Sequence, residues 1–182
     1  MSEKIETAVL AGGCFWCTEA VFQRLKGVQS VVSGYTGGNI KNPAYREITT
    51  GRTGHAEAIS ITYDANQISF TELLEVFFAT HDPTTLNQQG ADRGTQYRSA
   101  IFFGNIEQKQ LAEEFIQDLE DQKVFDKPIV TEVTPLGPFY KAEDYHQNYY
   151  NQNSSQGYCQ FVINPKINKL TNKFTAKLKE TA

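Results

Sequence analysis

The chain lacks the features that are typical of membrane, secreted and nucleic-acid-binding proteins. Its first eleven residues hold no basic region followed by a long apolar run, and no apolar run approaches a membrane span. The net charge of −4 argues against a nucleic-acid partner. Three unevenly spaced cysteines are too few for a disulfide scaffold. We therefore expect a cytoplasmic protein without a membrane partner, whose reduced cysteines are catalytic, metal-binding or inert.

What is present is the composition of an ordinary folded domain, with 40% hydrophobic and 21% charged residues. No repeat, low-complexity segment or linker divides the 182 residues, so we expect one catalytic domain over residues 1–182. Alternating and valine-rich stretches predict strands at residues 9–12, 28–35, 55–63, 97–103 and 129–136. Helical spacing predicts helices at residues 14–26, 70–81, 105–119 and 143–150.

Two of these helices have recognisable start signals. Ser69 and Glu72 form a capping-box pattern, and Asn105 is a favourable N-cap residue. The order of elements predicts an α+β fold, a two-layer ferredoxin-like sandwich with helices packed on a mainly antiparallel sheet. From about residue 151 we expect an irregular C-terminal tail, which carries Cys159.

The stretch from Gly12 to Cys17 joins a short apolar strand to a helix. Gly12 and Gly13 allow a tight turn and a close approach of the backbone. Cys14 then lies at the start of the helix, where free N–H groups and the positive end of the dipole favour a thiolate over a thiol. Two large aromatic rings, Phe15 and Trp16, follow it directly.

Cys14 and Cys17 form a C-x-x-C pair with three open interpretations. The two thiols can be inert core residues. They can be half of a zinc site, but the further ligands would have to come from Cys159 and one of three isolated histidines, His55, His81 and His146. A redox or nucleophilic role fits best, because residues i and i+3 in a first helical turn can meet the distance demands of a disulfide.

Glu57 is the second informative residue. It shares the parity of Ile59 and Ile61, the apolar face of its strand, where a carboxyl is costly to ionise and its pKa should rise. A solvated carboxyl at the end of a strand is the alternative. Chemistry alone does not single out the other polar side chains of the loops and the short helix, which are Tyr45, Asp92, Tyr97 and His146.

Seven ordered motifs resemble those of a known family. They are Gly13-Cys14-Phe15-Trp16, Gly34-Tyr35-Thr36-Gly37-Gly38, Asn42-Pro43-Ala44-Tyr45, Gly54-His55-Ala56-Glu57-Ala58, His81-Asp82-Pro83, Asp92-Arg93-Gly94-Thr95-Gln96-Tyr97-Arg98-Ser99 and Ala142-Glu143-Asp144-Tyr145-His146-Gln147. Over about residues 8–166 the chain is similar to the A-type peptide methionine sulfoxide reductases. The resemblance implies protein repair after oxidative damage, by reduction of methionine-S-sulfoxide, free or in proteins.

The resemblance also implies roles for individual residues. Cys14 would be the nucleophile, with Phe15 and Trp16 as the pocket for the substrate's methyl group. Glu57 would be the acid, and the hydroxyls of Tyr45 and Tyr97 would donate further hydrogen bonds to the sulfoxide oxygen. Asp92 and His146 would lie near the active site. Cys159 matches the place of the family's resolving cysteine, whereas Cys17 stands where many members have glycine.

The implied cycle needs no metal, flavin or nucleotide. Cys14 would become a sulfenic acid, a second thiol would condense with it, and thioredoxin or another dithiol would reduce the disulfide. Two alternatives from other classes are open at this point. One is a general thiol–disulfide oxidoreductase that uses Cys14 and Cys17, and the other is a zinc module without enzymatic activity.

Overall fold

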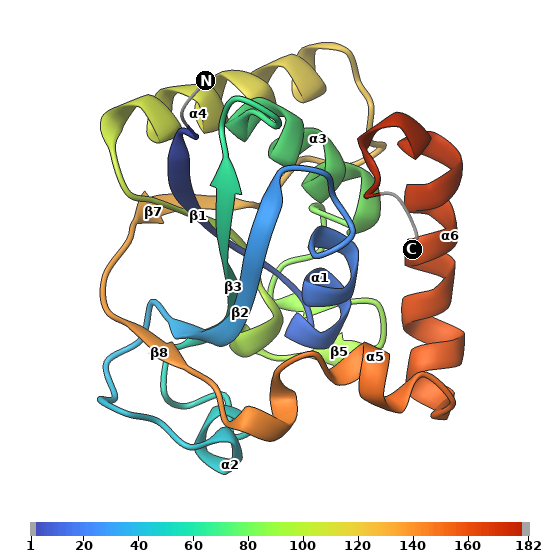
Figure 1. The fold of residues 1–182 in the computed structure, drawn as a ribbon. Helices are drawn as coiled ribbons and strands as arrows, with labels where there is room; N and C mark the ends of the chain where they lie inside the picture. Colours follow the sequence, from blue (N-terminus) through green and yellow to red (C-terminus); the bar gives the residue numbers. More distant parts are fainter. Residues whose placement is uncertain (1–2, 180–182) are drawn as a thin grey trace.

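A six-stranded sheet forms the centre of the computed structural model, which describes residues 3–179 (Figure 1). The order of its strands is β7-β6-β1-β3-β2-β8. Their bounds are β1 Ile5–Gly12, β2 Val28–Thr36, β3 Ala56–Asp64, β6 Ser99–Phe103, β7 Glu132–Pro135 and β8 Phe139–Lys141. A separate two-stranded hairpin consists of β4 Gln88–Gln89 and β5 Asp92–Arg93.

The sheet is mainly antiparallel, as predicted, but mixed. β1 pairs with β3 and β6, and β3 pairs with β2, all in antiparallel register. β7 lies parallel to β6, with Ala100 opposite Glu132, so one edge of the sheet departs from the expectation. At the other edge, Tyr35 of β2 pairs with Tyr140 of β8. The antiparallel register places the end of β1 beside the start of β3, and the cysteine stretch begins at this end of the sheet.

Helices account for most of the remaining chain. The α-helices are α1 Phe15–Phe22, α2 Tyr45–Ile48, α3 Phe70–Thr80, α4 Ile106–Asp121, α5 Tyr149–Asn153 and α6 Asn164–Lys173. Both predicted caps are confirmed: the Ser69 hydroxyl accepts from Glu72 N at 3.1 Å, and the Asn105 side chain accepts from Gln108 N at 2.8 Å. Within residues 3–179 no helix has the length and apolar character to cross a membrane.

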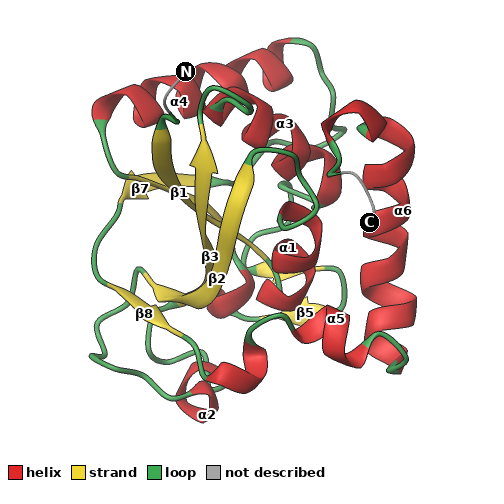
Figure 2. Ribbon diagram, viewed as in Figure 1, coloured by secondary structure: helices red, strands yellow, loops and turns green. Residues whose placement is uncertain are grey.

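Side chains alternate along each strand between the two faces of the sheet, and each face has its own apolar cluster. Leu10 and Ile61 point to the face that packs on α1, α3, α4 and α6, where the main core lies. Val9, together with Phe102, points to the opposite face, which Phe139 of β8 helps to cover. Figure 2 shows the long helices gathered on one side of the sheet and the β7–β8 connection along the other. The predicted packing of helices on one face of the sheet is therefore confirmed.

The C-terminal region differs from the expectation. Instead of an irregular tail, residues 149–173 form α5, a π-helix over Cys159–Ile163 and α6. The expected helix at residues 143–150 is only a 3₁₀ turn, Asp144–His146, followed by α5. The polar composition concealed these helices because their apolar side chains are few; Leu170 is the buried anchor of α6. The sheet and the C-terminal segment both pack on α1, and seven of the eight residues of α1 are buried.

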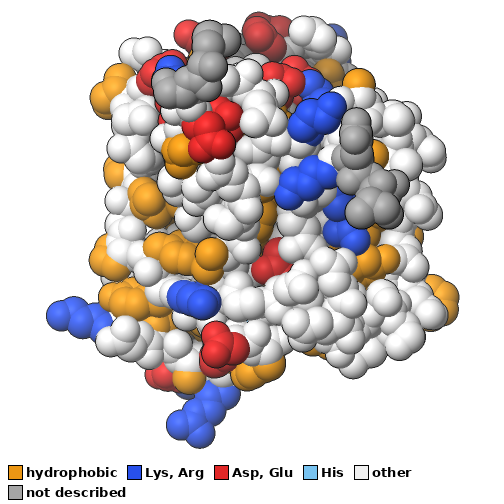
Figure 3. Space-filling view, in the orientation of Figure 1, with side chains coloured by type: hydrophobic (Ala, Val, Ile, Leu, Met, Phe, Trp, Pro, Cys, Tyr) orange, Lys and Arg blue, Asp and Glu red, His pale blue; other side chains and the backbone are white. Residues whose placement is uncertain are grey.

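The surface carries charges of both signs. On the face shown in Figure 3, basic side chains form a short row near the C-terminal end and stand singly elsewhere, among acidic and uncharged side chains. The ion pairs are mostly exposed, such as Lys141 with Asp144 at 3.8 Å. Such pairs contribute little to stability, so the fold depends on its core and its backbone hydrogen bonds.

Candidate functional site

The turn from β1 into α1 presents Cys14. Gly13 has a φ of +93°, a left-handed conformation that side chains disfavour, and a Cβ atom there would lie 2.6 Å from Cγ of Gln89. Cys14 precedes the first helical residue, and its carbonyl accepts from Cys17 N at 3.0 Å. The two glycines thus let the backbone turn sharply enough to place Cys14 at the start of α1, as predicted, with only 8% of its surface exposed.

The protonation of Cys14 is opposite to the expectation from the helix dipole. Burial raises the pKa of Cys14 well above its usual value, and a hydrogen bond to Cys17 and the charge of Glu57 raise it further. The pKa of Cys17 is lowered to about 7, first by the hydrogen bond from Cys14. Desolvation outweighs the dipole here, so the resting Cys14 is a thiol.

Glu57 lies inside the protein, as its parity on β3 predicted. Only 1% of its surface is exposed, and its Oε1 accepts from Phe15 N at 3.2 Å. Burial raises the pKa of Glu57 from 4.5 to about 8, although hydrogen bonds from Phe15 N and Cys14 oppose the shift. At neutral pH the carboxyl is therefore largely protonated and can donate a proton beside the Cys14 sulfur.

Phe15 and Trp16 have different environments. Phe15 is fully buried, and its ring lies 5.6 Å from that of Tyr35. Trp16 is half-buried, and its Nε1 donates to Nδ1 of His146 at 3.0 Å. The indole also stacks on Tyr149, with ring centroids 3.8 Å apart and an angle of 8° between the planes. Trp16 is thus an aromatic wall whose orientation is fixed from two sides.

His146 is fully buried beside this wall. Its ring lies 4.3 Å from that of Tyr45 and 5.2 Å from that of Phe15. Since Nδ1 accepts from Trp16, the neutral ring carries its proton on Nε2. That Nε2 atom is buried and has no hydrogen-bond partner among the described residues. Burial lowers the pKa of His146, so the ring stays neutral at pH 7.

The two predicted phenols lie around the same carboxyl. Burial raises the pKa of Tyr45 to about 12, and the charges of Glu57 and Cys14 add to the shift. The pKa of Tyr97 is raised for the same reasons in the same order. Both hydroxyls stay protonated at physiological pH and remain donors. Strand β3, the start of α2 and the 3₁₀ turn Thr95–Tyr97 therefore bring Glu57, Tyr45 and Tyr97 together with Cys14.

Asp92 and Cys159 complete the predicted set from two further elements. The Asp92 carboxylate, on β5, accepts from the hydroxyl of Tyr158 at 2.7 Å. Cys159 is fully buried in one apolar cluster with Cys14 and Cys17, and all three thiols are free. Burial raises the pKa of Cys159. The structure thus places all ten predicted site residues around the first turn of α1.

Sequence reasoning missed two residues of this region. Glu19 of α1 is 2% exposed and accepts from Tyr149 N at 3.2 Å and from the Ser33 hydroxyl at 3.3 Å. Burial raises its pKa to about 7. Its spacing of four residues from Phe15 signalled a position on the buried stripe of the helix. The other missed residue is Tyr158, for which only its position next to Cys159 was a signal.

Of the three histidines considered for a zinc module, His146 lies near the thiols, where its Nδ1 accepts from Trp16 Nε1. The other two have different partners. His55 joins Gly38 N to the carbonyl of Ile40, and His81 joins the Phe77 carbonyl to the Ser99 hydroxyl. Across residues 3–179, no three His, Cys, Asp or Glu side chains form a group that could hold a metal ion.

Comparisons with known proteins agree on one family. The family model described as peptide methionine sulfoxide reductase matches residues 6–179. The peptide methionine sulfoxide reductase MsrA of Deinococcus radiodurans is 59% identical over 174 residues, covering 96% of this chain and 84% of the relative. The MsrA of Acinetobacter baumannii strain SDF is 54% identical, covering 97% of this chain and 99% of the relative.

Solved structures give the same result. Methionine sulfoxide reductase A of Corynebacterium diphtheriae has a TM-score of 0.76 at 38% identity, covering 86% of this chain and 78% of that one. Reduced Mxr1 of Saccharomyces cerevisiae has a TM-score of 0.78 at 32% identity, covering 86% and 90%. The chain therefore belongs to the peptide methionine sulfoxide reductase family of oxidoreductases.

Proposed function

We propose that the chain reduces methionine-S-sulfoxide, free or in proteins, to methionine, with Cys14 as the nucleophile. The observation that carries this proposal is the buried Glu57 carboxyl, which accepts from the N–H of Phe15, the residue next to Cys14, and whose pKa burial raises to about 8. A sulfoxide sulfur becomes electrophilic only when its oxygen is protonated or strongly hydrogen-bonded. A general thiol–disulfide oxidoreductase does not explain this acid together with the aromatic pair that follows Cys14.

The first step follows from these protonation states. Glu57 donates its proton to the sulfoxide oxygen, with hydrogen bonds from the hydroxyls of Tyr45 and Tyr97. Cys14 gives up its proton, for which the sulfur of Cys17 is an acceptor, and attacks the substrate. The oxygen is transferred to Cys14, so methionine leaves and a sulfenic acid remains. One thiol is oxidised by two electrons and one sulfoxide is reduced by two.

The aromatic residues of the site orient the substrate in this proposal. The Trp16 indole forms the wall for the methyl group of the sulfoxide, with the buried ring of Phe15 behind it. The hydrogen bond from Trp16 to His146 and the stack on Tyr149 keep that wall in place. We place Asp92 at the edge of the same pocket, because its charge helps to raise the pKa of Glu57 and that of Tyr45.

The sulfenic acid is resolved by a second thiol. We assign this step to Cys159, with Cys17 as the second candidate, since both lie in the apolar cluster that contains Cys14. Thioredoxin, or another dithiol, then reduces the disulfide by exchange. The cycle needs no prosthetic group. Three free cysteines support a reducing, cytoplasmic location.

We also propose a domain extent and a fold class for the chain. We assign residues 1–182 to one catalytic domain. We also assign the core to the ferredoxin-like class, supported by the strand order β6-β1-β3-β2 and by helices α1 and α3 that connect the strands in two βαβ units.

Substitution of the nucleophile tests the proposed function. Cys14→Ser should abolish methionine release with dithiothreitol as reductant, because a hydroxyl at pH 7 is a far poorer nucleophile than sulfur. The wild-type enzyme should release one methionine per chain without reductant, and mass spectrometry should find one new disulfide that includes Cys14. Appreciable turnover by Cys14→Ser would refute the assignment.

A further inference from the structure

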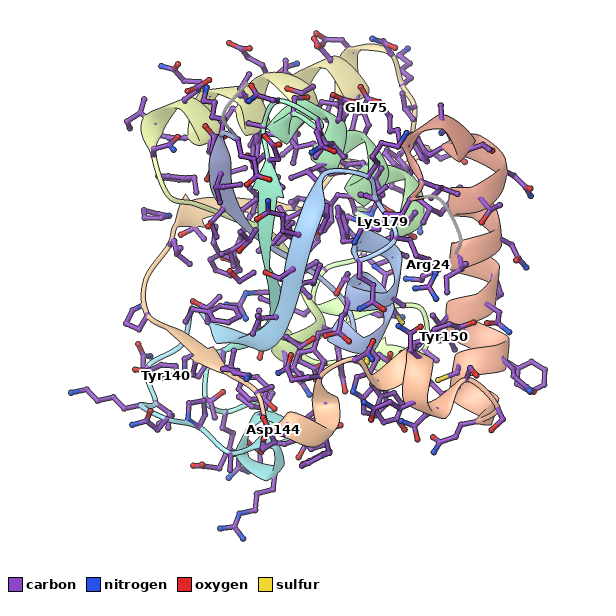
Figure 4. The ribbon with its side chains drawn as sticks, in the orientation of Figure 1. Arg24, Glu75, Tyr140, Asp144, Tyr150 and Lys179 are labelled. Carbon is purple, nitrogen blue, oxygen red and sulfur yellow. The ribbon has the colours of Figure 1, made fainter. Side chains whose placement is uncertain are left out.

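The C-terminal segment over residues 147–163 is tied to α1 at several points. At its start, Tyr149 N donates to the buried Glu19 carboxyl at 3.2 Å. Further along, Arg24 donates to the Asn151 side chain at 3.0 Å, and its guanidinium lies 5.2 Å from the centre of the Tyr150 ring. Figure 4 shows Arg24 and Tyr150 close together where the segment meets α1. These ties hold the segment along the helix, and the rings of Tyr149 and Tyr150 pack against the cluster that contains the three cysteines.

Tyr158 is the tie at the active-site end. Its hydroxyl donates to the Asp92 carboxylate at 2.7 Å and lies 3.6 Å from the Cys17 sulfur. Its ring meets the Trp16 indole edge-on, with centroids 5.8 Å apart and an angle of 82° between the planes. One side chain thus connects the C-terminal segment to β5 and to the first turn of α1.

Cys159, the next residue, begins the π-helix. Asn164 N donates to the Cys159 carbonyl, a bond over five residues that makes a turn wider than that of an α-helix. Cys159 is fully buried, whereas Phe161 in the same turn is 81% exposed. Ile163 at the other end of the turn is also fully buried, so the turn is packed at both ends, and Tyr158 is the residue directly before the Cys159 thiol whose hydroxyl makes polar contacts at the active site.

We propose that Tyr158 is a positioning residue for disulfide formation: held by Asp92, it places the Cys159 thiol for attack on the oxidised Cys14. In this step the S–S bond forms, the S–O bond of the sulfenic acid breaks, and the hydroxyl leaves as water with the thiol proton. Without the hydrogen bond of Tyr158, the Cys159 thiol lies less often in position to attack Cys14. Cys17, fixed one helical turn from Cys14, then forms a larger share of the disulfide. This inference rests on the proposed function of Cys14.

The test compares Tyr158→Phe with Tyr150→Phe. The first removes the hydroxyl that binds Asp92, while the control removes a hydroxyl of the same segment that binds Asn164. Each enzyme is mixed with methionine sulfoxide without reductant, and methionine release, trapping of the sulfenic acid by dimedone and the disulfide map are followed with time. Melting curves verify that both variants fold.

Tyr158→Phe should release one methionine per chain but form its disulfide about tenfold more slowly, as expected for the loss of one hydrogen bond to a charged group. Trapped sulfenic acid and the share of the Cys14–Cys17 disulfide should rise, and Tyr150→Phe should behave as the wild type. Asp92→Asn, which weakens the same hydrogen bond from its other side, should shift the disulfide map in the same direction and replaces Tyr158→Phe if that variant does not fold.

The inference is overturned if Tyr158→Phe forms the wild-type disulfide at the wild-type rate. It is also overturned if the wild type forms only the Cys14–Cys17 disulfide, or if Tyr150→Phe causes an equal defect. Failure of the proposed function has a different signature, because then the wild-type enzyme itself releases no methionine.

Discussion

Glu57→Gln should slow the catalytic step and, at pH 8, raise the free energy of unfolding. In the folded chain the pKa of Glu57 is about 8, above the ordinary value of 4.5 that it regains on unfolding. As the pH rises from 4.5 to 8, the unfolded chain releases this proton first, so the free energy of unfolding falls across that window. One pKa unit corresponds to about 1.4 kcal/mol, which makes the fall on the order of 3–4 kcal/mol between pH 5 and pH 8.

The glutamine side chain of the Glu57→Gln variant would keep an oxygen for the hydrogen bond from Phe15 N but has no proton to lose. We expect the variant to lack this fall in stability and to be more stable than the wild type at pH 8. We also expect its first methionine release to be slower by roughly 10²–10⁴-fold, the usual contribution of a positioned acid. The wild-type rate of that step should decline above pH 8, and the rate of the variant should not follow the same curve.

The measurements are urea unfolding at pH 5 and pH 8, and single-turnover methionine release from pH 6 to pH 10. Glu114→Gln, which removes an exposed carboxyl of α4, is the matched control and should change neither quantity. If Glu57→Gln keeps the wild-type rate and pH profile, Glu57 is not the acid. If it unfolds with the wild-type dependence on pH, the carboxyl is not protonated in the folded enzyme.

Three further predictions concern Trp16, Gly13 and the second thiol of the cycle. Trp16→Ala should lower kcat/KM for methionine sulfoxide by about 10–200-fold, because contacts to a methyl group contribute roughly 1–3 kcal/mol, and a melting curve separates this from a loss of stability. Gly13→Ala should destabilise the protein by at least about 1–2 kcal/mol, since its φ of +93° disfavours a side chain, and thermal unfolding measures this. With thioredoxin as reductant, Cys159→Ser should lose most turnover and Cys17→Ser should keep most of it; the reverse result would assign resolution to Cys17.

The central fold was predictable because its local signals agree with its tertiary contacts. The alternation around Ile59 marks β3, and the cap at Ser69 marks the start of α3, both within a residue or two. The C-terminal helices were not predictable in the same way. A polar segment that contains a π-helix has little apolar periodicity, and its position depends on contacts such as that of Tyr149 with Glu19.

The candidate site likewise has one feature that a single strand predicts and another that depends on tertiary contacts. The burial of Glu57 followed from the parity of a single strand, since alternation decides which face a side chain takes. The protonation of Cys14 could not be read locally. The helix start favours a thiolate, but burial and the neighbouring Glu57 and Cys17 favour the thiol, and these neighbours come together only in three dimensions.

The thiol state of Cys14 has a consequence for the proposed chemistry. A buried thiol reacts slowly with alkylating agents and oxidants, because the thiolate is the reactive form. The same desolvation that keeps Cys14 protonated also keeps the proton on Glu57. In the proposed step a bound sulfoxide changes both at once: its oxygen takes the proton of Glu57, and the electrophilic sulfur then draws the electrons of Cys14. Loss of the Glu57 proton leaves a carboxylate beside Cys14, so the negative charge of a thiolate becomes more costly once the oxygen has been protonated. Attack and proton transfer must therefore be closely coupled, which confines nucleophilic reactivity to the time when substrate is bound.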